Sequence, residues 1–297
     1  MIINEPKTFG GGWSDRKLDA LRNYLQRYTT ALKNTPFKLV YIDAFAGAGV
    51  HKLPTIEPSL LKLDEESILE DEDNYRHGSP LIALTNSPPF DEFVFIEQDS
   101  VSIAQLKAQV AAHPASKDRN LRFLQGDANE ELLELTKEDW RSRRAVAFLD
   151  PFALQVRWDT IEKIAETQAI DMWLLFPAMA VNRMMPKSGK VPEKWAEKLN
   201  LLFGETGWKE TFYSQSEQTT LFGDAEINKV PKVFETLSSY VTCRLESVFE
   251  KANQSPLILK NKSGTPIFLL CFASGNPKGA PIATRIAQHI INTSSYG

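Results

Sequence analysis

Four short segments of the sequence each place an acidic side chain after an apolar run. The segments are Asp43-Ala-Phe45-Ala-Gly47-Ala-Gly49, Phe93-Val-Phe-Ile-Glu97, Gln125-Gly-Asp127-Ala128 and Phe148-Leu-Asp150-Pro151-Phe152. Carboxylates accept hydrogen bonds from ribose hydroxyls and amino groups, and glycines let the backbone approach a ligand closely. Together the segments predict a site for a cofactor that contains a nucleoside.

Each segment suggests its own contact with such a cofactor. We expect Asp43 to hold an amino-acid end of the cofactor, and Glu97 to accept hydrogen bonds from two ribose hydroxyls. Asp127 would hold the adenine amino group. The predicted cofactor-binding residues are Asp43, Phe45, Gly47, Gly49, Glu97, Asp127 and Ala128.

The distance along the chain between the glycines and the second acid is unusually long. Gly47 and Glu97 are 97 − 47 = 50 residues apart, whereas the separation in dinucleotide sites is about 20. Removing the 28 residues of segment 50–77 leaves 50 − 28 = 22. Between positions 57 and 76, two basic residues stand against eight acids, a charge of 2 − 8 = −6. We therefore expect an acidic inserted loop over 50–77.

The segments lie in a chain whose predicted strands and helices alternate. Strands are expected over 38–46, 92–97, 121–125, 145–150 and 170–176, and helices over 81–86, 100–112, 128–137 and 159–167. Such alternation predicts an α/β fold with a mostly parallel, doubly wound sheet, whose ligands bind beyond the carboxyl ends of the strands. An amphipathic helix comes first, and an antiparallel hairpin (257–259 with 267–273) and a helix over 283–291 come last.

These elements suggest a domain organisation with two insertions. We expect a helical lead-in over 1–36, a core over 37–180 and 242–297, the acidic loop, and a helical insertion over 181–241 after the fifth strand. In that insertion the sequence indicates helices over 192–203 and 231–241 and no strong strand.

The start of the helical insertion is the predicted substrate contact. Between positions 182 and 198, five basic residues stand against two acids, so 5 − 2 = +3. Basic side chains there could hold phosphates and Trp195 could stack on a base. The other interpretation is a solvated amphipathic helix with Trp195 packed inward. The predicted substrate-binding residues are Arg183, Lys187 and Lys190.

Six motifs are distinctive as a set: FGGGWSDRKLDALRNYL, KLVYIDAFAGAG, HGSP, FVFIEQD, FLDPFALQV and IDMWLLFP. Through them the sequence resembles, over nearly its full length, the family of three-Cys-motif partner proteins. The resemblance implies the Rossmann-like fold of class I methyltransferases and S-adenosylmethionine as cofactor. It also implies a protein partner with a three-cysteine motif, itself similar to radical S-adenosylmethionine proteins. It implies no particular substrate.

The segment Asp150-Pro151-Phe152 provides the predicted catalytic residues. Methyltransferases that act on amino groups of nucleic acids carry an acid or amide, two prolines and an aromatic residue after strand 4. Here the second proline is missing and Phe152 comes one place early. Our hypothesis is that Asp150 orients the nucleophile or accepts its proton while Phe152 stacks on a planar substrate. The other interpretation makes Phe152 a core aromatic residue beneath the sheet edge.

Composition limits the classes of protein. Two cysteines without a CxxC pair and four scattered histidines favour neither a disulfide framework nor a metal site. The net charge of −4 gives no general support for nucleic-acid binding. The N-terminus lacks signal-peptide features, and the longest apolar stretch, 172–181, contains Pro177 and is too short to span a membrane. We expect a cytoplasmic protein.

Several functions remain open from the sequence. The leading one is methyl transfer to a nucleic acid or its base. The same fold could act on a protein or a small molecule, or serve as a non-catalytic docking subunit. A nicotinamide enzyme is less well matched because its fingerprint has a third glycine before a helix. The acids could also be solvated strand ends.

Overall fold

The chain folds into one mixed sheet with helices on both faces, and a small separate hairpin. The computed structural model describes residues 12–48, 78–219 and 225–294. The large sheet has the strand order β3-β2-β1-β4-β5-β10-β8, and β9 pairs with β10. Its strands are β1 (Lys38–Asp43), β2 (Glu92–Glu97), β3 (Asn120–Gln125), β4 (Arg143–Leu149), β5 (Ile170–Phe176), β8 (Lys251–Ala252), β9 (Leu257–Lys260) and β10 (Pro266–Ser274).

Strands β1 to β5 are parallel, whereas β10 runs antiparallel to β5, β8 and β9. The order reverses between β1 and β4, because β2 and β3 lie on one side of β1 while β4 and β5 lie on the other. In sheets of this type the ligand binds beyond the carboxyl ends at that reversal. The predicted Rossmann-like α/β fold with an antiparallel C-terminal hairpin is confirmed.

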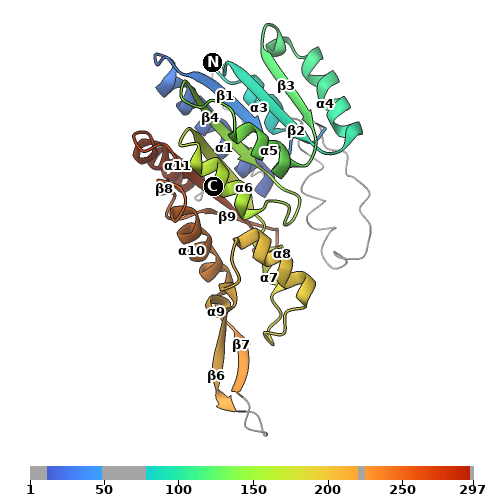
Figure 1. Cartoon of the computed structure of the whole chain (residues 1–297), viewed down its shortest axis with the longest axis vertical. Coiled ribbons are helices and arrows are strands. Elements are labelled where there is room, and N and C mark those ends of the chain that lie inside the picture. Colours follow the sequence, from blue (N-terminus) through green and yellow to red (C-terminus); the bar gives the residue numbers. More distant parts are fainter. Residues whose placement is uncertain (1–11, 49–77, 220–224, 295–297) are drawn as a thin grey trace, which may run out of the picture.

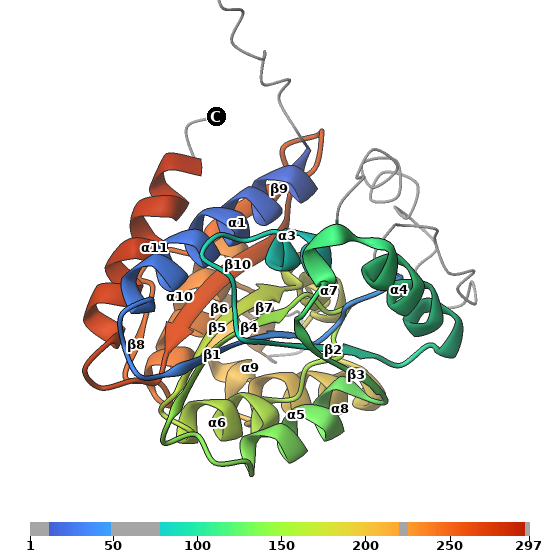
Figure 2. The same ribbon diagram turned by 90° about the horizontal axis from the view of Figure 1, so that it is seen from above.

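Two layers of helices cover the sheet (Figure 2). The helices are α1 (Trp13–Leu32), α3 (Ser79–Leu84), α4 (Ser100–Ala112), α5 (Ala128–Thr136), α6 (Trp158–Glu166), α7 (Ala178–Met184), α8 (Glu193–Phe203), α9 (Trp208–Phe212), α10 (Val233–Glu246) and α11 (Ala280–Ser294). A short 3-10 helix, η1, spans Pro114–Ser116. One layer contains α1, α3, α4 and α11, and the other contains α5, α6, α8 and α10.

The alternation of side chains along each strand divides the core in two. Leu39 and Tyr41 of β1 face the layer that contains α1, whereas Val40 and Ile42 face the opposite layer. Successive side chains of a strand point to opposite faces, so a strand that is covered on both sides must be apolar throughout. The helix that opens the chain is thus part of the core packing and covers the sheet.

The insertion after β5 differs from the sequence expectation. It contains helices, as predicted, but also a two-stranded antiparallel sheet of β6 (Tyr213–Thr219) and β7 (Ala225–Lys229). The hairpin projects from the lower end of the molecule (Figure 1). Apart from Tyr213 at its base, β6 (YSQSEQT) has no strong apolar alternation, so the sequence gives no clear strand signal there.

None of the helices in the described ranges is both long and apolar enough to cross a membrane. The predicted acidic loop over 50–77 lies outside the described residues, and α3 begins shortly after it at Ser79. Gly49 lies outside them as well.

Candidate functional site

The turn after β1 and the end of β2 are joined by a hydrogen bond at the carboxyl edge of the sheet. The Gly47 amide donates to Oε2 of Glu97 at 2.9 Å. The Asp99 amide donates to the other oxygen, Oε1, at 2.8 Å. A carboxylate offers about four acceptor positions. Glu97 can therefore hold this turn and still accept hydrogen bonds from a ligand.

Gly47 has a backbone conformation that favours glycine. Its φ is +59°, and a Cβ placed there would meet no atom within 4 Å. The left-handed conformation is costly for residues with a side chain. The absence of a side chain thus leaves open space in front of the turn, where the backbone can approach a ligand.

Asp43 lies at the end of β1, beneath this turn, and is completely buried. The Tyr41 hydroxyl donates to its Oδ2 at 3.0 Å. Its Oδ1 is buried and accepts no hydrogen bond of good geometry from the described residues. Burial raises the pKa of Asp43 to about 7, although the Ser79 and Tyr41 hydroxyls oppose the shift. Asp43 therefore carries one unsatisfied acceptor below the glycine turn, and its predicted contact with an amino-acid end stays a prediction.

Asp127 begins α5 and serves as its N-cap. Its Oδ1 accepts hydrogen bonds from the backbone amides of Asn129 at 2.9 Å and Glu130 at 3.3 Å. Helix caps of this kind use one carboxylate oxygen to satisfy the first amides of a helix. Asp127 is exposed and the following Ala128 is buried. The other oxygen, Oδ2, accepts no hydrogen bond from the described chain, so it is left for a ligand at the same edge.

Asp150, directly after β4, forms an ion pair that the sequence did not reveal. Lys17 of α1 donates from Nζ to Oδ2 of Asp150 at 2.6 Å. The side chains of Lys17 and Asp150 are 6% and 22% exposed. The Lys17 ammonium also lies over the ring of Trp13, 4.9 Å from its centre. The first turns of α1 are therefore part of the candidate site.

A signal for Lys17 was present in the sequence. On a helix, positions 17, 21, 24 and 28 share one face, and Leu21, Tyr24 and Tyr28 are all buried against the sheet. A lysine on the apolar face of a helix needs a buried acceptor. The charged residue within the apolar stripe could have been identified, although its partner could not.

Phe152 is 50% exposed, so the structure contradicts the interpretation of Phe152 as a core aromatic residue. The next residue, Ala153, has a φ of +63°. A residue other than glycine in the left-handed region is uncommon, and such strain is concentrated at functional sites. Pro151, by contrast, is buried. The strained turn directs an aromatic ring outward beside Asp150.

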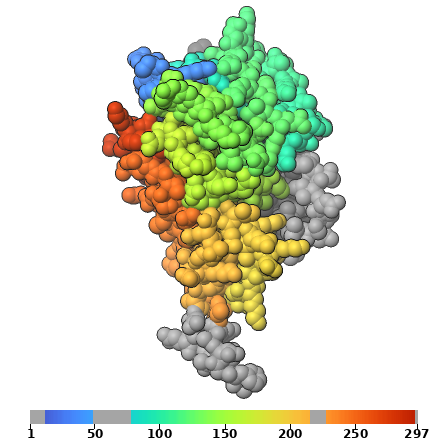
Figure 3. Space-filling model, in the orientation of Figure 1, coloured from blue at the N-terminus to red at the C-terminus, as the bar shows by residue number. Residues whose placement is uncertain are grey.

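The basic residues predicted to bind substrate lie at the far end of α7 and in the loop before α8. Arg183, Lys187 and Lys190 are exposed. Helix α7 begins directly after β5, so this region continues outward from the carboxyl edge (Figure 1). In Figure 3 the same region forms the narrower lower part of the molecule. The structure places these residues on the ligand side of the sheet, and their contact with substrate stays a prediction.

The hairpin is fastened to this loop at its base. Lys229 donates from Nζ to the Asn182 carbonyl at 2.7 Å, to Oδ1 of Asn182 at 2.5 Å and to the Met185 carbonyl at 2.6 Å. The backbone amide of Lys229 also donates to the Lys187 carbonyl at 3.1 Å. The lysine thus satisfies carbonyls at the end of α7, and it ties the hairpin to the basic loop.

Comparisons with known proteins found distant likenesses. No protein-family model and no curated protein matches the chain. Among solved structures, it is similar to a Legionella pneumophila protein (13% identity, TM-score 0.45, 96% of this chain and 94% of that one). It is also similar to spermidine synthase from Thermotoga maritima (11% identity, TM-score 0.37, 89% and 60%). A third is magnesium protoporphyrin IX methyltransferase from Synechocystis with bound S-adenosylmethionine (10% identity, TM-score 0.30, 71% and 78%).

Such distant likenesses say nothing about activity or substrate. The assignment of the fold rests on the sheet itself, which has the strand order β3-β2-β1-β4-β5 and an antiparallel β10 beside β5. This is the Rossmann-like class I methyltransferase fold that the sequence predicted.

Proposed function

We propose that this protein is an S-adenosylmethionine-dependent methyltransferase whose acceptor is a nucleic acid or its base, with an amino group as the target atom. The observation that carries the proposal is the arrangement at the carboxyl edge. The glycine turn, Glu97 and Asp127 lie on one side of the strand reversal, and Asp150 with Phe152 follows the strand on the other side. A cofactor and an acceptor would therefore meet at the reversal.

Two features of the described residues fit a bound nucleoside cofactor. One is the open space in front of Gly47, and the other is the unsatisfied Oδ1 of Asp43 below it. Glu97 would hold the ribose hydroxyls, Asp127 the adenine amino group, and Asp43 the amino-acid end, with Phe45 and Ala128 beside them. When bound, S-adenosylmethionine supplies an electrophilic methyl group.

Asp150 would position the acceptor. Lys17 occupies its Oδ2 at 2.6 Å, and Oδ1 accepts no hydrogen bond from the described residues. That oxygen can accept a hydrogen bond from an amino group and hold its lone pair toward the cofactor pocket. Holding reacting groups in line provides much of the rate gain in transfer reactions. The Pro151 carbonyl could accept the second N–H of the amino group.

Phe152 and the basic loop support a nucleic-acid acceptor. A half-exposed aromatic ring next to the reacting group offers a surface on which a base can stack, a contact worth about 1–3 kcal/mol. Arg183, Lys187 and Lys190 would bind backbone phosphates further out. The net charge of −4 therefore need not oppose binding, because the cationic groups are local.

The test is transfer of radiolabelled methyl groups to total nucleic acid and to total protein, preceded by calorimetric titration with S-adenosylmethionine and its demethylated product. Label in nucleic acid is expected. Label in protein alone would redirect the proposal to a protein acceptor, and binding without transfer to either would favour a small molecule or a docking role. Absence of cofactor binding would overturn the proposal.

Asp150→Asn and Asp150→Ala should abolish transfer while leaving cofactor binding largely intact. The matched control is Asp19→Ala, which removes an exposed aspartate from the surface of α1. Unchanged turnover in the Asp150 variants would contradict the role of Asp150.

The resemblance to three-Cys-motif partner proteins adds a protein partner to the proposal. The projecting hairpin β6–β7 favours such an interaction, because it extends beyond the core and is fastened at its base by Lys229. We expect a three-cysteine protein to co-purify with the full chain and not with a chain in which a short glycine turn replaces 214–228. Equal recovery with both chains would exclude the hairpin as the contact.

A further inference from the structure

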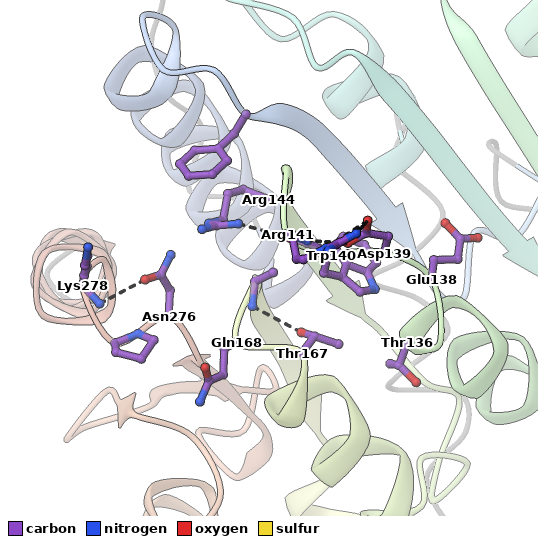
Figure 4. Close-up of a pocket in the computed structure, with 13 residues that line it drawn as sticks. Thr136, Glu138, Asp139, Trp140, Arg141, Arg144, Thr167, Gln168, Asn276 and Lys278 are labelled. Atoms are coloured by element: carbon purple, nitrogen blue, oxygen red, sulfur yellow. Dashed lines mark hydrogen bonds and ion pairs between the residues drawn. The ribbon is translucent and has the colours of Figure 1, made fainter.

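The edge of the sheet opposite the candidate site contains a pocket of about 630 Å³. It lies where β4 and β5 begin, beside the loop that leads into α11 (Figure 4). Ligand pockets commonly have volumes of this order. Its polar lining includes Thr136, Arg141, Arg144, Gln168, Asn276 and Lys278. None of these side chains takes part in the proposed methyl transfer.

The acidic side chains of the lining already have cationic partners. Glu138 forms ion pairs with Arg122 at 2.9 Å and with Arg143. Asp139 pairs with Arg141 at 2.7 Å. Arg144 and Lys278, by contrast, have no carboxylate within 4.0 Å among the described residues. Neither cationic group therefore forms a direct ion pair within the described part of the chain, although the buried Asp171 attracts Arg144 at longer range.

The Arg144 guanidinium is only partly satisfied. Its Nη1 donates to the carbonyls of Trp140 at 3.3 Å and Arg143 at 2.6 Å. Its Nε is buried and has no acceptor in the described chain. A guanidinium has five N–H donors, and each buried donor normally has a partner. The ring of Phe37 lies 3.8 Å from the guanidinium and fixes its plane.

Amide groups complete the pocket. Oδ1 of Asn276 accepts hydrogen bonds from the amides of Lys278 at 3.0 Å and Gly279 at 3.1 Å, so its NH₂ group is left to donate. Figure 4 shows the Arg144 guanidinium on the side of the pocket that faces Asn276. Gln168 also lines the pocket and has a φ of +51°, a strained conformation for this residue type, but its side chain extends away from Arg144 and Asn276 (Figure 4).

We propose that this pocket binds a phosphate group, held by Arg144 and Lys278 with an amide donor from Asn276. A planar guanidinium can donate two parallel hydrogen bonds to phosphate oxygens, and Lys278 adds a point charge. The phosphate would belong to a small anion or to a nucleic-acid backbone. The inference is independent of the proposed methyl transfer.

The test is a titration of the full chain with pyrophosphate. Binding is monitored through the side-chain N–H signals of arginine and asparagine in ¹H–¹⁵N NMR spectra. Arg144→Lys identifies the Arg144 Nε–H signal. We expect pyrophosphate to shift this signal and the Asn276 NH₂ signals, whereas sodium chloride at equal ionic strength leaves them in place. A short single-stranded oligonucleotide, titrated separately, shows whether a nucleic-acid backbone reaches the same site.

Charge reversal supplies the matched comparison. Lys278→Glu should weaken pyrophosphate binding about fivefold or more, because one nearby charge contributes about 1 kcal/mol to the attraction. Lys260→Glu, which changes another exposed lysine on β9 outside the lining, should change pyrophosphate binding little. Absence of any shift at Arg144, or equal weakening by both variants, would overturn the proposal.

Discussion

Replacement of Lys17 by methionine should both destabilise the fold and stop methyl transfer. Lys17→Met keeps the length and the apolar part of the side chain and removes its charge. The pair with Asp150 is short, 2.6 Å, and its lysine is only 6% exposed. At an effective dielectric constant of about 20, the gross attraction at this distance is about 6 kcal/mol.

The net effect is smaller because both groups lose hydration when the pair forms. Removing one partner of a buried pair costs about 3–5 kcal/mol, since the other charge is left unpaired. Asp150 is 22% exposed and can partly rehydrate, so we expect a loss of about 3 kcal/mol, at the lower end of that range. The nearby Asp43 carboxyl adds repulsion when it is ionised.

Urea unfolding at neutral pH measures this loss. The control is Arg22→Met, which removes an exposed pair with Asp19 on the same helix, 52% and 56% exposed. Such surface pairs contribute about 0–1 kcal/mol. A loss from Lys17→Met no larger than that of the control would refute the reasoning.

The double variant Lys17→Met/Asp150→Asn separates the charge effect from packing. It removes the unpaired carboxylate and should regain at least about 1 kcal/mol relative to Lys17→Met. If the double variant is no more stable, packing of the lysine side chain and not its charge explains the loss. In either variant, cofactor binding measured by calorimetry should be retained while transfer is lost.

Three further predictions concern other residues. Gly47→Ala should weaken binding of S-adenosylmethionine at least about tenfold, since a Cβ enters the open space at the turn. The control is Gly264→Ala, at φ +81° in the loop between β9 and β10, which should introduce similar strain without weakening cofactor binding. Calorimetry measures both affinities, and equal affinities of the two variants would contradict the predicted role of Gly47. Burial raises the pKa of Asp171 from 3.8 to about 6, although the nearby Ser274, the Tyr24 hydroxyl that donates to Asp171 and the charge of Arg144 oppose the shift. This carboxyl therefore favours the folded state below about pH 4 and loses up to about 3 kcal/mol of that contribution as pH rises through 6. The Asp171→Asn variant should not show this loss of stability with rising pH. If the difference in unfolding free energy between the two proteins stays constant from about pH 4 to about pH 7, the prediction is wrong. Ala153→Gly should relieve the left-handed strain at φ +63° without lowering the melting temperature. It should nevertheless reduce the rate of methyl transfer, because Phe152 is held less firmly. An unchanged turnover would show that the strain has no part in the reaction.

Much of the candidate site could be read from the sequence because strand ends and glycine turns are local features. Asp43, Glu97 and Asp150 follow apolar runs that are buried on both faces, and a parallel sheet brings the ends of such runs to one edge. The left-handed conformation of Gly47 is one that glycine permits at little cost. The closing helix was found but is longer than expected, spanning Ala280–Ser294, because its ends carry no distinct apolar pattern.

The sequence by itself therefore determined the order of the elements, the faces of the strands and the acids at the carboxyl edge, since these depend on patterns within a few residues. Only the tertiary structure decided which distant residues meet. Lys17 and Asp150 are 133 positions apart, and no local pattern specifies that α1 crosses the sheet where β4 ends. The same holds for the pocket around Arg144 and for the hairpin beyond β5, because both arise from packing between segments that are remote along the chain.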